Sequence, residues 1–303
     1  MMEIQLNTAY SFCQRGRRDH QEDSRFPDAD CAPGSQRFFV VCDGIGGCEK
    51  GEVASQTVCQ AMAKEMKGTD YNADFTNSHF HRILDAAYHA LDKMVDDSNR
   101  DMGTTMTFIC FHAGGCTMAH IGDSRIYQIR PSEGIIYRSN DHSVVNSLVH
   151  NGILAPDEAD SHPQRNVINR YMEAVEADQT RCTATVMRTE DVKAGDYFLL
   201  CTDGVLHRIS DDELQLLLLS EKPDEDKMKE LADICTDSED NNTAWLVSIR
   251  KVTSDGMDSD DKPSMTETSV TRRLTMKARS QEEVESIQPS GNNLRKWFNK
   301  MFK

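Results

Sequence analysis

Acidic residues follow directly after two of the most apolar stretches of the chain. Residues 38–42 are five apolar, strand-favouring residues that lead into Asp43 and the glycine-rich residues 44–47. Residues 197–201 form a second stretch of this kind, and Asp203 follows it after one threonine. We expect each aspartate to lie at the end of a buried strand. Glycines beside a carboxylate let backbone carbonyl groups and water approach a ligand closely, because glycine has no Cβ.

Further carboxylates occupy similar positions. Glu22 and Asp23 lie in a charged segment after the first predicted strand, Asp123 lies in a tight turn, and Asp240 precedes the last predicted strand. Each of them alone can be structural, since aspartate suits a turn by bonding to its own backbone. If all these carboxylates meet at one edge of a sheet, however, their mutual repulsion is severe without bound cations.

The donor atoms of this set favour one kind of chemistry. All of them are oxygens, with no histidine or cysteine, and such sets favour Mg²⁺ or Mn²⁺ over Zn²⁺. A carboxylate that bridges two such ions about 3.5–4 Å apart is the arrangement that activates a water for in-line attack on phosphorus. Arg18 lies four residues before Glu22 in the sequence, and its guanidinium can bind phosphate oxygens through two parallel hydrogen bonds.

Composition narrows the function further. The 303 residues carry a formal net charge of −16, which argues against nucleic acid as a partner because no net basic surface can neutralise phosphates. The cysteines include no Cys-x-x-Cys pair, and most lie in apolar stretches where buried thiols are common, so we expect neither zinc nor disulfides. The N-terminus has no apolar signal core, and no apolar run approaches the ~18 residues that cross a bilayer.

Several predicted elements must position these residues. Residues 3–13 predict a first strand, and residues 15–23 a charged loop. Apolar residues recur at helical spacing over 51–66 and again over 78–95, where Ser78 can cap the helix.

The middle of the chain is rich in strand signals. Short turns separate four predicted strands, at 104–112, 116–121, 124–130 and 135–138. This pattern indicates an antiparallel meander with Asp123 in one of its turns. Residues 143–180 are polar and irregular apart from a helix-like start, which suits a mobile insertion. The remaining predicted elements are a strand at 197–201, helices at 211–219 and 224–235, and a strand at 243–250.

The order of these residues resembles the metal-dependent protein phosphatases, the type 2C serine/threonine family. Seven motifs between about residue 10 and residue 250 carry the resemblance: Arg18-x-x-x-Glu22-Asp23, Asp43-Gly44-x-Gly46-Gly47, Gly103-Thr104-Thr105, Gly122-Asp123-Ser124-Arg125, Asp141-His142-Ser143, Cys201-Thr202-Asp203-Gly204 and Asp240-Asn241-x-Thr243. Residues 162–167 resemble the flap segment of the compact bacterial branch of this family.

The resemblance implies a metal-binding role for five residues. Asp43 would bridge two metal ions, and the Gly44 carbonyl would bind one of them. Asp203 and Asp240 would hold the first ion, and Glu22 would reach the second, largely through water.

It also implies three further roles around the metal ions. Arg18 would bind the substrate phosphate, and Asp23 would orient a metal-bound water. Asp123, together with Asp203, would hold a third and weaker ion.

One position departs from the family pattern. Many eukaryotic members carry a histidine between the two glycine positions of the second motif as a candidate general acid, and this chain has Ile45 there. The proton for the leaving serine or threonine oxygen must then come from elsewhere, such as a metal-bound water. His20 and His142 do not obviously replace that histidine, and for His142 we expect a structural hydrogen-bonding role.

We therefore expect one α/β domain, at residues 1–252, made of two packed antiparallel sheets flanked by helices, as the family implies. Its expected activity is the hydrolysis of phosphoserine and phosphothreonine in proteins at two tight Mn²⁺ or Mg²⁺ ions, with a weaker third ion and no covalent phosphoenzyme. One alternative is a pseudophosphatase or phosphoprotein-binding module, which would lack a metal carboxylate, and none is missing. Another is an interaction protein that acts through its C-terminal tail.

The expected partners follow from this activity. They are phosphoserine and phosphothreonine proteins, including a cognate serine/threonine kinase and its substrates, and they exclude nucleic acid. We expect a monomer in the cytoplasm.

The C-terminus differs from the rest of the chain. Residues 253–291 are polar with few aliphatic side chains, which predicts a disordered linker. Residues 292–303 form a basic amphipathic segment, in which an apolar stripe recurs at helical spacing and consists of Leu294, Trp297, Phe298, Met301 and Phe302. The basic residues beside this stripe are Arg295, Lys296, Lys300 and Lys303. Such a segment suits the surface of an anionic membrane, where each basic residue contributes ~1 kcal/mol, or docking on the acidic catalytic domain or a partner.

Sedimentation with anionic liposomes separates these two readings. We predict that the intact chain pellets with the liposomes, whereas a chain ending at Gly291 stays in the supernatant, because residues 292–303 carry the apolar stripe and its positive charges. If the two chains sediment equally with the liposomes, docking of residues 292–303 on the catalytic domain or on a partner protein would be the better explanation.

Overall fold

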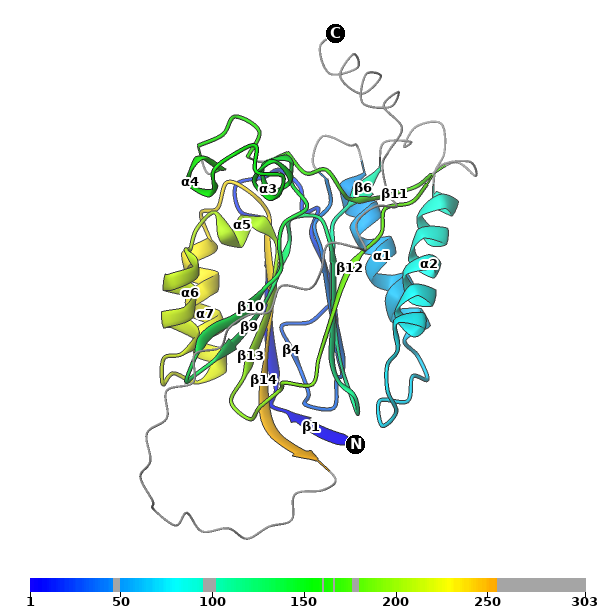
Figure 1. Cartoon of the computed structure of the whole chain (residues 1–303), viewed down its shortest axis with the longest axis vertical. Coiled ribbons are helices and arrows are strands. Elements are labelled where there is room, and N and C mark those ends of the chain that lie inside the picture. Colours follow the sequence, from blue (N-terminus) through cyan, green and yellow to red (C-terminus); the bar gives the residue numbers. More distant parts are fainter. Residues whose placement is uncertain (46–49, 95–101, 160, 166, 176–179, 255–303) are drawn as a thin grey trace. The chain divides into compact units, whose positions relative to one another are not determined.

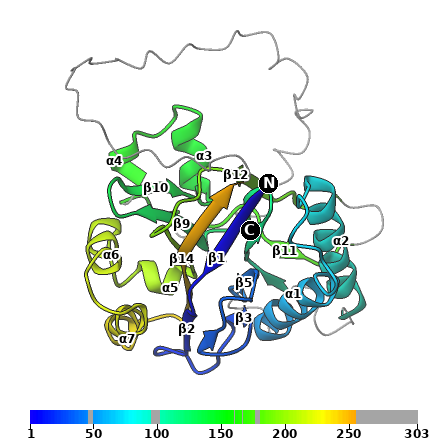
Figure 2. The same cartoon turned by 90° about the horizontal axis from the view of Figure 1, so that it is seen from below.

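Two antiparallel sheets pack face to face, and helices cover both outer faces (Figure 1). This computed structural model describes residues 1–45, 50–94, 102–159, 161–165, 167–175 and 180–254. Figure 2 shows helices α1 and α2 on one side of the strands, with α6 and α7 on the other. The architecture confirms the predicted α/β class of two packed antiparallel sheets with flanking helices.

The larger sheet contains seven strands. Its order is β10 (Gly134–Arg138), β9 (Arg125–Arg130), β13 (Tyr197–Cys201), β14 (Asn242–Ser254), β2 (Ala9–Gln14) and β4 (Cys31–Ala32), and β1 (Met2–Leu6) also pairs with β14. The smaller sheet has the order β12 (Thr185–Thr189), β8 (Gly115–Ile121), β7 (Met106–His112), β5 (Phe38–Cys42) and β3 (Ser24–Phe26). A short pair joins β6 (Gly103–Thr104) to β11 (Met172–Glu173).

The helices surround these sheets. They are α1 (Gly51–Glu65), α2 (Asn77–Met94), α3 (Val144–His150), α4 (Pro156–Ala159), α5 (Asp203–Leu206), α6 (Asp211–Leu218) and α7 (Asp224–Cys235).

Strand β5 is apolar throughout because both of its faces are buried. Phe39 and Val41 point into the core between the sheets, where the Phe39 and Trp245 ring centroids lie 5.0 Å apart. Phe38, Val40 and Cys42 belong instead to the core beneath α1 and α2. A strand buried on both sides reads as a continuous apolar run, and Asp43 is the first residue beyond it.

The predicted meander is wrong at one point. β7 pairs with β8, and β9 pairs with β10, as expected. β9, however, pairs with β13 in the larger sheet, so the chain crosses between the sheets over residues 122–124. Gly122 has φ +105° there, and a Cβ would lie 2.6 Å from Thr105. Spacing alone does not reveal such a crossover, because a short turn can join strands of two different sheets.

Two further predicted boundaries change. The single strand at 3–13 is two strands, β1 and β2, which both pair with β14. Ser78 lies inside α2 instead of capping it, since the Thr76 carbonyl accepts from the backbone N–H groups of His79 and Phe80. Ser143 does cap α3, where its side chain accepts from the Asn146 N–H at 3.2 Å.

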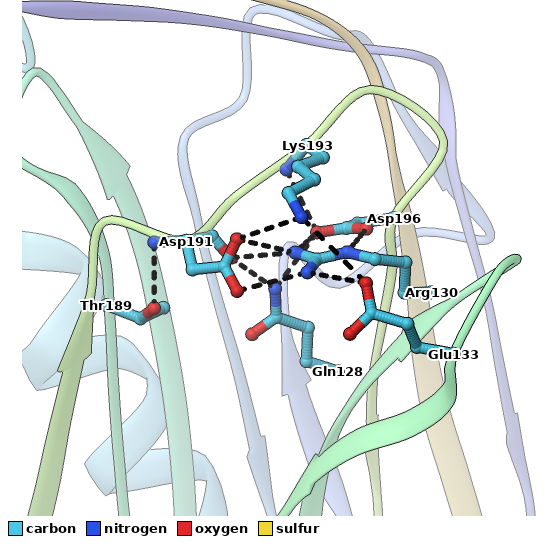
Figure 3. Close-up of polar contacts among 7 residues, drawn as sticks. All are labelled: Gln128, Arg130, Glu133, Thr189, Asp191, Lys193 and Asp196. Atoms are coloured by element: carbon cyan, nitrogen blue, oxygen red, sulfur yellow. Dashed lines mark hydrogen bonds and ion pairs between the residues drawn. The ribbon is translucent and has the colours of Figure 1, made fainter. Parts of the chain in front are cut away.

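A cluster of ion pairs around the buried Arg130 and Asp196 holds the connection from β12 to β13 (Figure 3), and we call it the Arg130 clamp. Arg130 of β9 donates from Nε and Nη2 to Asp196 at 2.8 and 2.9 Å, and from Nη1 and Nη2 to Asp191 at 3.0 Å each. Asp196 is fully buried and also accepts from the Gln128 side chain at 3.0 Å and from the Lys193 N–H at 3.0 Å. Because β12 and β13 belong to different sheets, this cluster ties the sheets together at the end where β13 begins.

Within the described residues, no helix is long and apolar enough to span a membrane. Strand β14 continues to Ser254, two residues beyond the predicted domain boundary. The predicted linker from residue 255 onward and the basic segment 292–303 lie outside the described residues, so both stay predictions.

Loss of the Arg130 clamp should destabilise the fold strongly. Arg130→Met leaves the Asp196 carboxylate buried without its counter-charge, so we expect a free energy of unfolding about 3–5 kcal/mol lower in urea titrations. Lys222→Met is the matched control, because it breaks an exposed pair with Glu230 and should cost less than about 1 kcal/mol. Similar unfolding midpoints for the two variants would contradict the clamp.

Candidate metal centre

Strand register brings the predicted carboxylates to one edge of the sandwich. The end of β13 pairs with the start of β14, Cys201 opposite Ala244, and also with the start of β9, Cys201 opposite Arg125. Asp203, Asp240 and Asp123 each lie within a few residues of these paired positions. Figure 1 shows α5 and β6 at this same end of the strands. The carboxylates therefore approach one another from both sheets.

The backbone at Asp43 is held by two threonines and by the segment around Glu22. The Asp43 N–H donates to Thr105 Oγ1 at 3.0 Å, and Thr104 Oγ1 donates to the Asp43 carbonyl at 2.8 Å. The Gly44 N–H donates to the Glu22 carbonyl at 3.1 Å. A Cβ on Gly44 would lie 2.4 Å from the Gly51 backbone, so glycine is required at this close approach.

Asn241 holds the loop that carries Arg18, Glu22 and Asp23. Its Nδ2 donates to the carbonyls of Arg15 at 2.8 Å and His20 at 2.9 Å, and its Oδ1 accepts from the Glu22 N–H at 2.8 Å. The sequence pattern contained Asn241 but assigned it no role. A side-chain amide can donate and accept hydrogen bonds at once, so it is suited to bridging two segments. This property of asparagine is the feature of the sequence from which the role of Asn241 could have been predicted.

Asp23 is a buried site residue, at 5% exposure. Thr202 Oγ1 donates to its Oδ2 at 3.0 Å, whereas its Oδ1 is buried without a partner. Burial, reinforced by the charges of Asp203 and Asp240, raises the pKa of Asp23 to about 8. Thr202 thus orients one carboxylate oxygen and leaves the other available.

The pKa values of Asp43 and Asp203 are raised as well. Burial raises the pKa of Asp43 well above its ordinary value, and the charges of Asp23, Asp203, Asp123 and Asp240 raise it further. Burial likewise raises the pKa of Asp203, against the lowering effects of His207 and of a hydrogen bond shared with Asp43. Burial also raises the pKa of Glu22. The fold therefore assembles more negative charge than it neutralises.

Arg18 forms an ion pair with one of the predicted ligands. Its Nη2 donates to Asp240 Oδ2 at 2.7 Å, and the arginine side chain remains 46% exposed. The sequence had placed this guanidinium toward substrate phosphate. In the structure it contacts a carboxylate that was expected to hold metal.

Asp123 lies in the crossover between the sheets, at the side of a groove of about 650 Å³. Asp203 and His207 line the same groove, and His207 Nε2 lies 3.8 Å from Asp203 Oδ2. Burial and the charge of Asp203 raise the pKa of Asp123 to about 7. His207 carries no sequence motif, and its position was not anticipated.

A pair of oxygen-binding ions fits these residues on two observations. Asp203 Oδ1 and Asp23 Oδ1 are buried oxygens without donors, and the carboxylates together raise one another's pKa. As the side chains stand, no three acidic, histidine or cysteine side chains in the described ranges close around one point. For Asp240 to bind a cation, its ion pair with Arg18 would therefore have to break. Gly46 and Gly47 of the predicted motif lie outside the described residues.

Neither His20 nor His142 supplies an acid at this centre. Ile45 lies beside Gly103, to which its N–H is bonded at 3.0 Å. The His20 carbonyl is bonded to Asn241, and the His142 ring bonds to Gly122 and Thr185. The structural hydrogen-bonding role expected for His142 is thus confirmed.

Comparison with known proteins gives one consistent result. Residues 15–249 match the family described as protein phosphatase 2C. The serine/threonine protein phosphatase PstP of Mycobacterium tuberculosis is 34% identical over 203 residues, which cover 65% of this chain and only 36% of PstP. Protein phosphatase PhpP of Streptococcus pneumoniae is 31% identical over 222 residues, which cover 71% of this chain and 86% of PhpP.

Solved structures agree with these matches. The crystal structure of M. tuberculosis PstP gives a TM-score of 0.68 at 30% identity and covers 82% of this chain and 100% of that chain. The catalytic domain of PstP in complex with two manganese ions gives a TM-score of 0.66 at 27% identity, with 82% and 100% covered.

Removing one negative charge should stabilise the metal-free protein. We expect Asp203→Asn to raise the free energy of unfolding in chelator, because it relieves the repulsion that raises the pKa values of Asp43 and Asp123. With Mn²⁺ at about 100 times its dissociation constant, the wild type should gain about 2.7 kcal/mol and the variant clearly less.

Asp85→Asn, an exposed change on α2, is the control for net charge, and urea titrations with and without Mn²⁺ give the comparison. An Asp203→Asn protein that is less stable than the wild type in chelator would contradict the account.

Proposed function

This chain belongs to the protein phosphatase 2C family, and on that basis we propose that it hydrolyses phosphoserine and phosphothreonine in proteins. The proposed reaction uses a water activated at two Mn²⁺ or Mg²⁺ ions and forms no covalent phosphoenzyme. The observation that carries the proposal is the gathering of carboxylates from both sheets, with mutually raised pKa values, around Asp43. The manganese complex of the PstP catalytic domain supports the choice of ion.

Each carboxylate has a proposed ligand role. Asp43 would be shared by the two tight ions, and the Gly44 carbonyl would bind one of them. Asp203 and Asp240 would hold the first ion, and Glu22 would reach the second, largely through water. When bound, the ions supply positive charge that polarises the phosphoryl group and lowers the pKa of the attacking water.

Asp23 is suited to orient the attacking water. Thr202 fixes its Oδ2, so its buried and unpartnered Oδ1 can accept a hydrogen bond from that water. A carboxylate so held does not have to reorganise as the reaction proceeds.

Arg18 is suited to recognise the phosphate. Its side chain is exposed and bonded to Asp240, a ligand that would exchange this partner for a cation. The freed guanidinium can then donate to phosphate oxygens, for which its planar fork is well matched.

We further propose the cellular setting that the sequence suggested. The substrates would be phosphoproteins that a cognate serine/threonine kinase modifies in the cytoplasm, and residues 292–303 would tether the protein to the inner membrane face. A pseudophosphatase is the weaker alternative, because every carboxylate of the proposed centre is present.

Replacing Asp43 should abolish turnover. Asp43→Asn keeps the shape of the side chain and removes the bridging charge, so we expect phosphopeptide hydrolysis to fall by at least about 1,000-fold, as after loss of a central electrostatic group. Chelator should abolish wild-type activity, and Mn²⁺ or Mg²⁺ should restore it. Undiminished turnover by the variant would rule out the two-metal proposal.

Replacing Arg18 should separate substrate binding from metal binding. Arg18→Ala should raise KM for a phosphopeptide by about 10-fold or more, while calorimetric Mn²⁺ affinity holds or improves because Asp240 loses its competing partner. Arg17→Ala, on the neighbouring exposed arginine, is the matched control. A loss of Mn²⁺ affinity in Arg18→Ala would make Arg18 a structural residue instead.

A further inference from the structure

Asp123 depends on the backbone of the crossover for its position. Its carboxylate accepts a hydrogen bond from its own backbone N–H. Asp123 lies where the chain leaves β8 in the smaller sheet for β9 in the larger one. Whatever fixes the backbone of residues 122–124 therefore fixes the direction of this carboxylate.

His142 brackets the first residue of the crossover. The Gly122 N–H donates to His142 Nδ1 at 3.1 Å, and the His142 N–H donates to the Gly122 carbonyl at 2.9 Å. Both backbone groups of Gly122 thus bond to one residue. Gly122 is also the residue with φ +105°, a conformation that is open to glycine and that residues with a side chain rarely adopt.

The other side of the His142 ring is anchored to the smaller sheet. A backbone N–H can only donate, so Nδ1 is the acceptor and the neutral ring carries its proton on Nε2. Nε2 then donates to Thr185 Oγ1 of β12, at 2.9 Å. The ring also stacks on His120 of β8, with centroids 4.5 Å apart. One imidazole therefore connects the crossover to two strands of the sheet that the chain is leaving.

We propose that His142 is a positioning residue for Asp123, which it directs through Gly122 toward the groove shared with Asp203. The inference rests on the proposed function and on a further premise taken from the family resemblance, namely that Asp123 and Asp203 hold a weaker third ion. A second contact steadies the far side of the crossover, where Ser124 Oγ and Thr105 Oγ1 lie 2.8 Å apart. Thr105 also accepts from the Asp43 N–H, so this contact is part of the central metal site, whereas His142 is hydrogen-bonded to Gly122 and not to Asp43 or Thr105.

Two variants of His142 distinguish its two hydrogen bonds. In His142→Asn, Oδ1 takes the place of Nδ1 and can still accept from Gly122. In His142→Gln, the side-chain amide reaches the place of Nε2 and can still bond to Thr185, but the acceptor for Gly122 is lost. Thr185→Val is the control that removes only the outer partner.

Calorimetric titration of the full chain with Mn²⁺ is the measurement, with Asp123→Asn as the reference for loss of the weak site. We expect His142→Gln to weaken the weak site by about 10- to 100-fold, the usual effect of removing a group that orients a metal ligand. His142→Asn and Thr185→Val should stay within about threefold of the wild type. The two tight sites should be unchanged in all four variants, and the Gly122 amide should lose its protection from hydrogen exchange only in His142→Gln.

Equal weak-site affinity in His142→Asn and His142→Gln would overturn the inference, because the bond to Gly122 would then have no separate effect. If the wild type bound Mn²⁺ at the weak site no better than Asp123→Asn does, Asp123 would not be a ligand of that site and the inference would be wrong. The proposed two-metal reaction would not be affected by this result. Failure of the proposed function itself would look different, since wild-type protein loaded with Mn²⁺ would then hydrolyse no phosphopeptide.

Discussion

Repulsion among carboxylates at one end of the sandwich is the constraint on which the rest of the structure depends. Asp23, Asp43, Asp123 and Asp203 all have raised pKa values, and burial is the first cause in each case. A fold that buries acids together in this way gives up stability in the absence of counter-charge. The proposed ions would supply that charge, so the same feature that destabilises the metal-free protein would provide its affinity for metal.

Neutral polar side chains hold these acids in place. Thr202 bonds to one carboxylate oxygen of Asp23, and Thr105 and Asn241 bond to backbone groups near the acids. Basic side chains placed there would instead have neutralised the acids and competed with a cation. Arg18 is the exception, and it is exposed, so its pair with Asp240 is open to exchange.

Cohesion of the sandwich is provided away from this end. The core between the sheets includes Phe39 and Trp245, and the Arg130 cluster ties the two sheets together where β13 begins. Charges there are paired and satisfied, in contrast to those near Asp43. The stability of the fold and the chemistry of the site are thus placed at opposite ends of the same strands, which allows the site to remain electrostatically strained.

Local patterns determined much of this protein from the sequence alone. The bounds of the 197–201 strand and the 224–235 helix were predicted without error, because each depends on periodicity within a few residues. The positions of Asp43 and Asp203 at strand ends were predicted for the same reason. Only the tertiary structure decided that β8 and β9 part into different sheets, since turn length does not record which strand will pair with which.

The partners of the site residues were also decided only by the tertiary structure. Asn241 bonds to Arg15 across 226 residues of sequence, and Thr202 bonds to Asp23 across 179. His142 reaches Gly122 and Thr185 from the residues between β10 and α3, which belong to no helix or strand. The residue types and spacing specified which acids could bind metal, but the hydrogen bonds that aim those acids join distant segments. They exist only once both sheets have formed and brought those segments together.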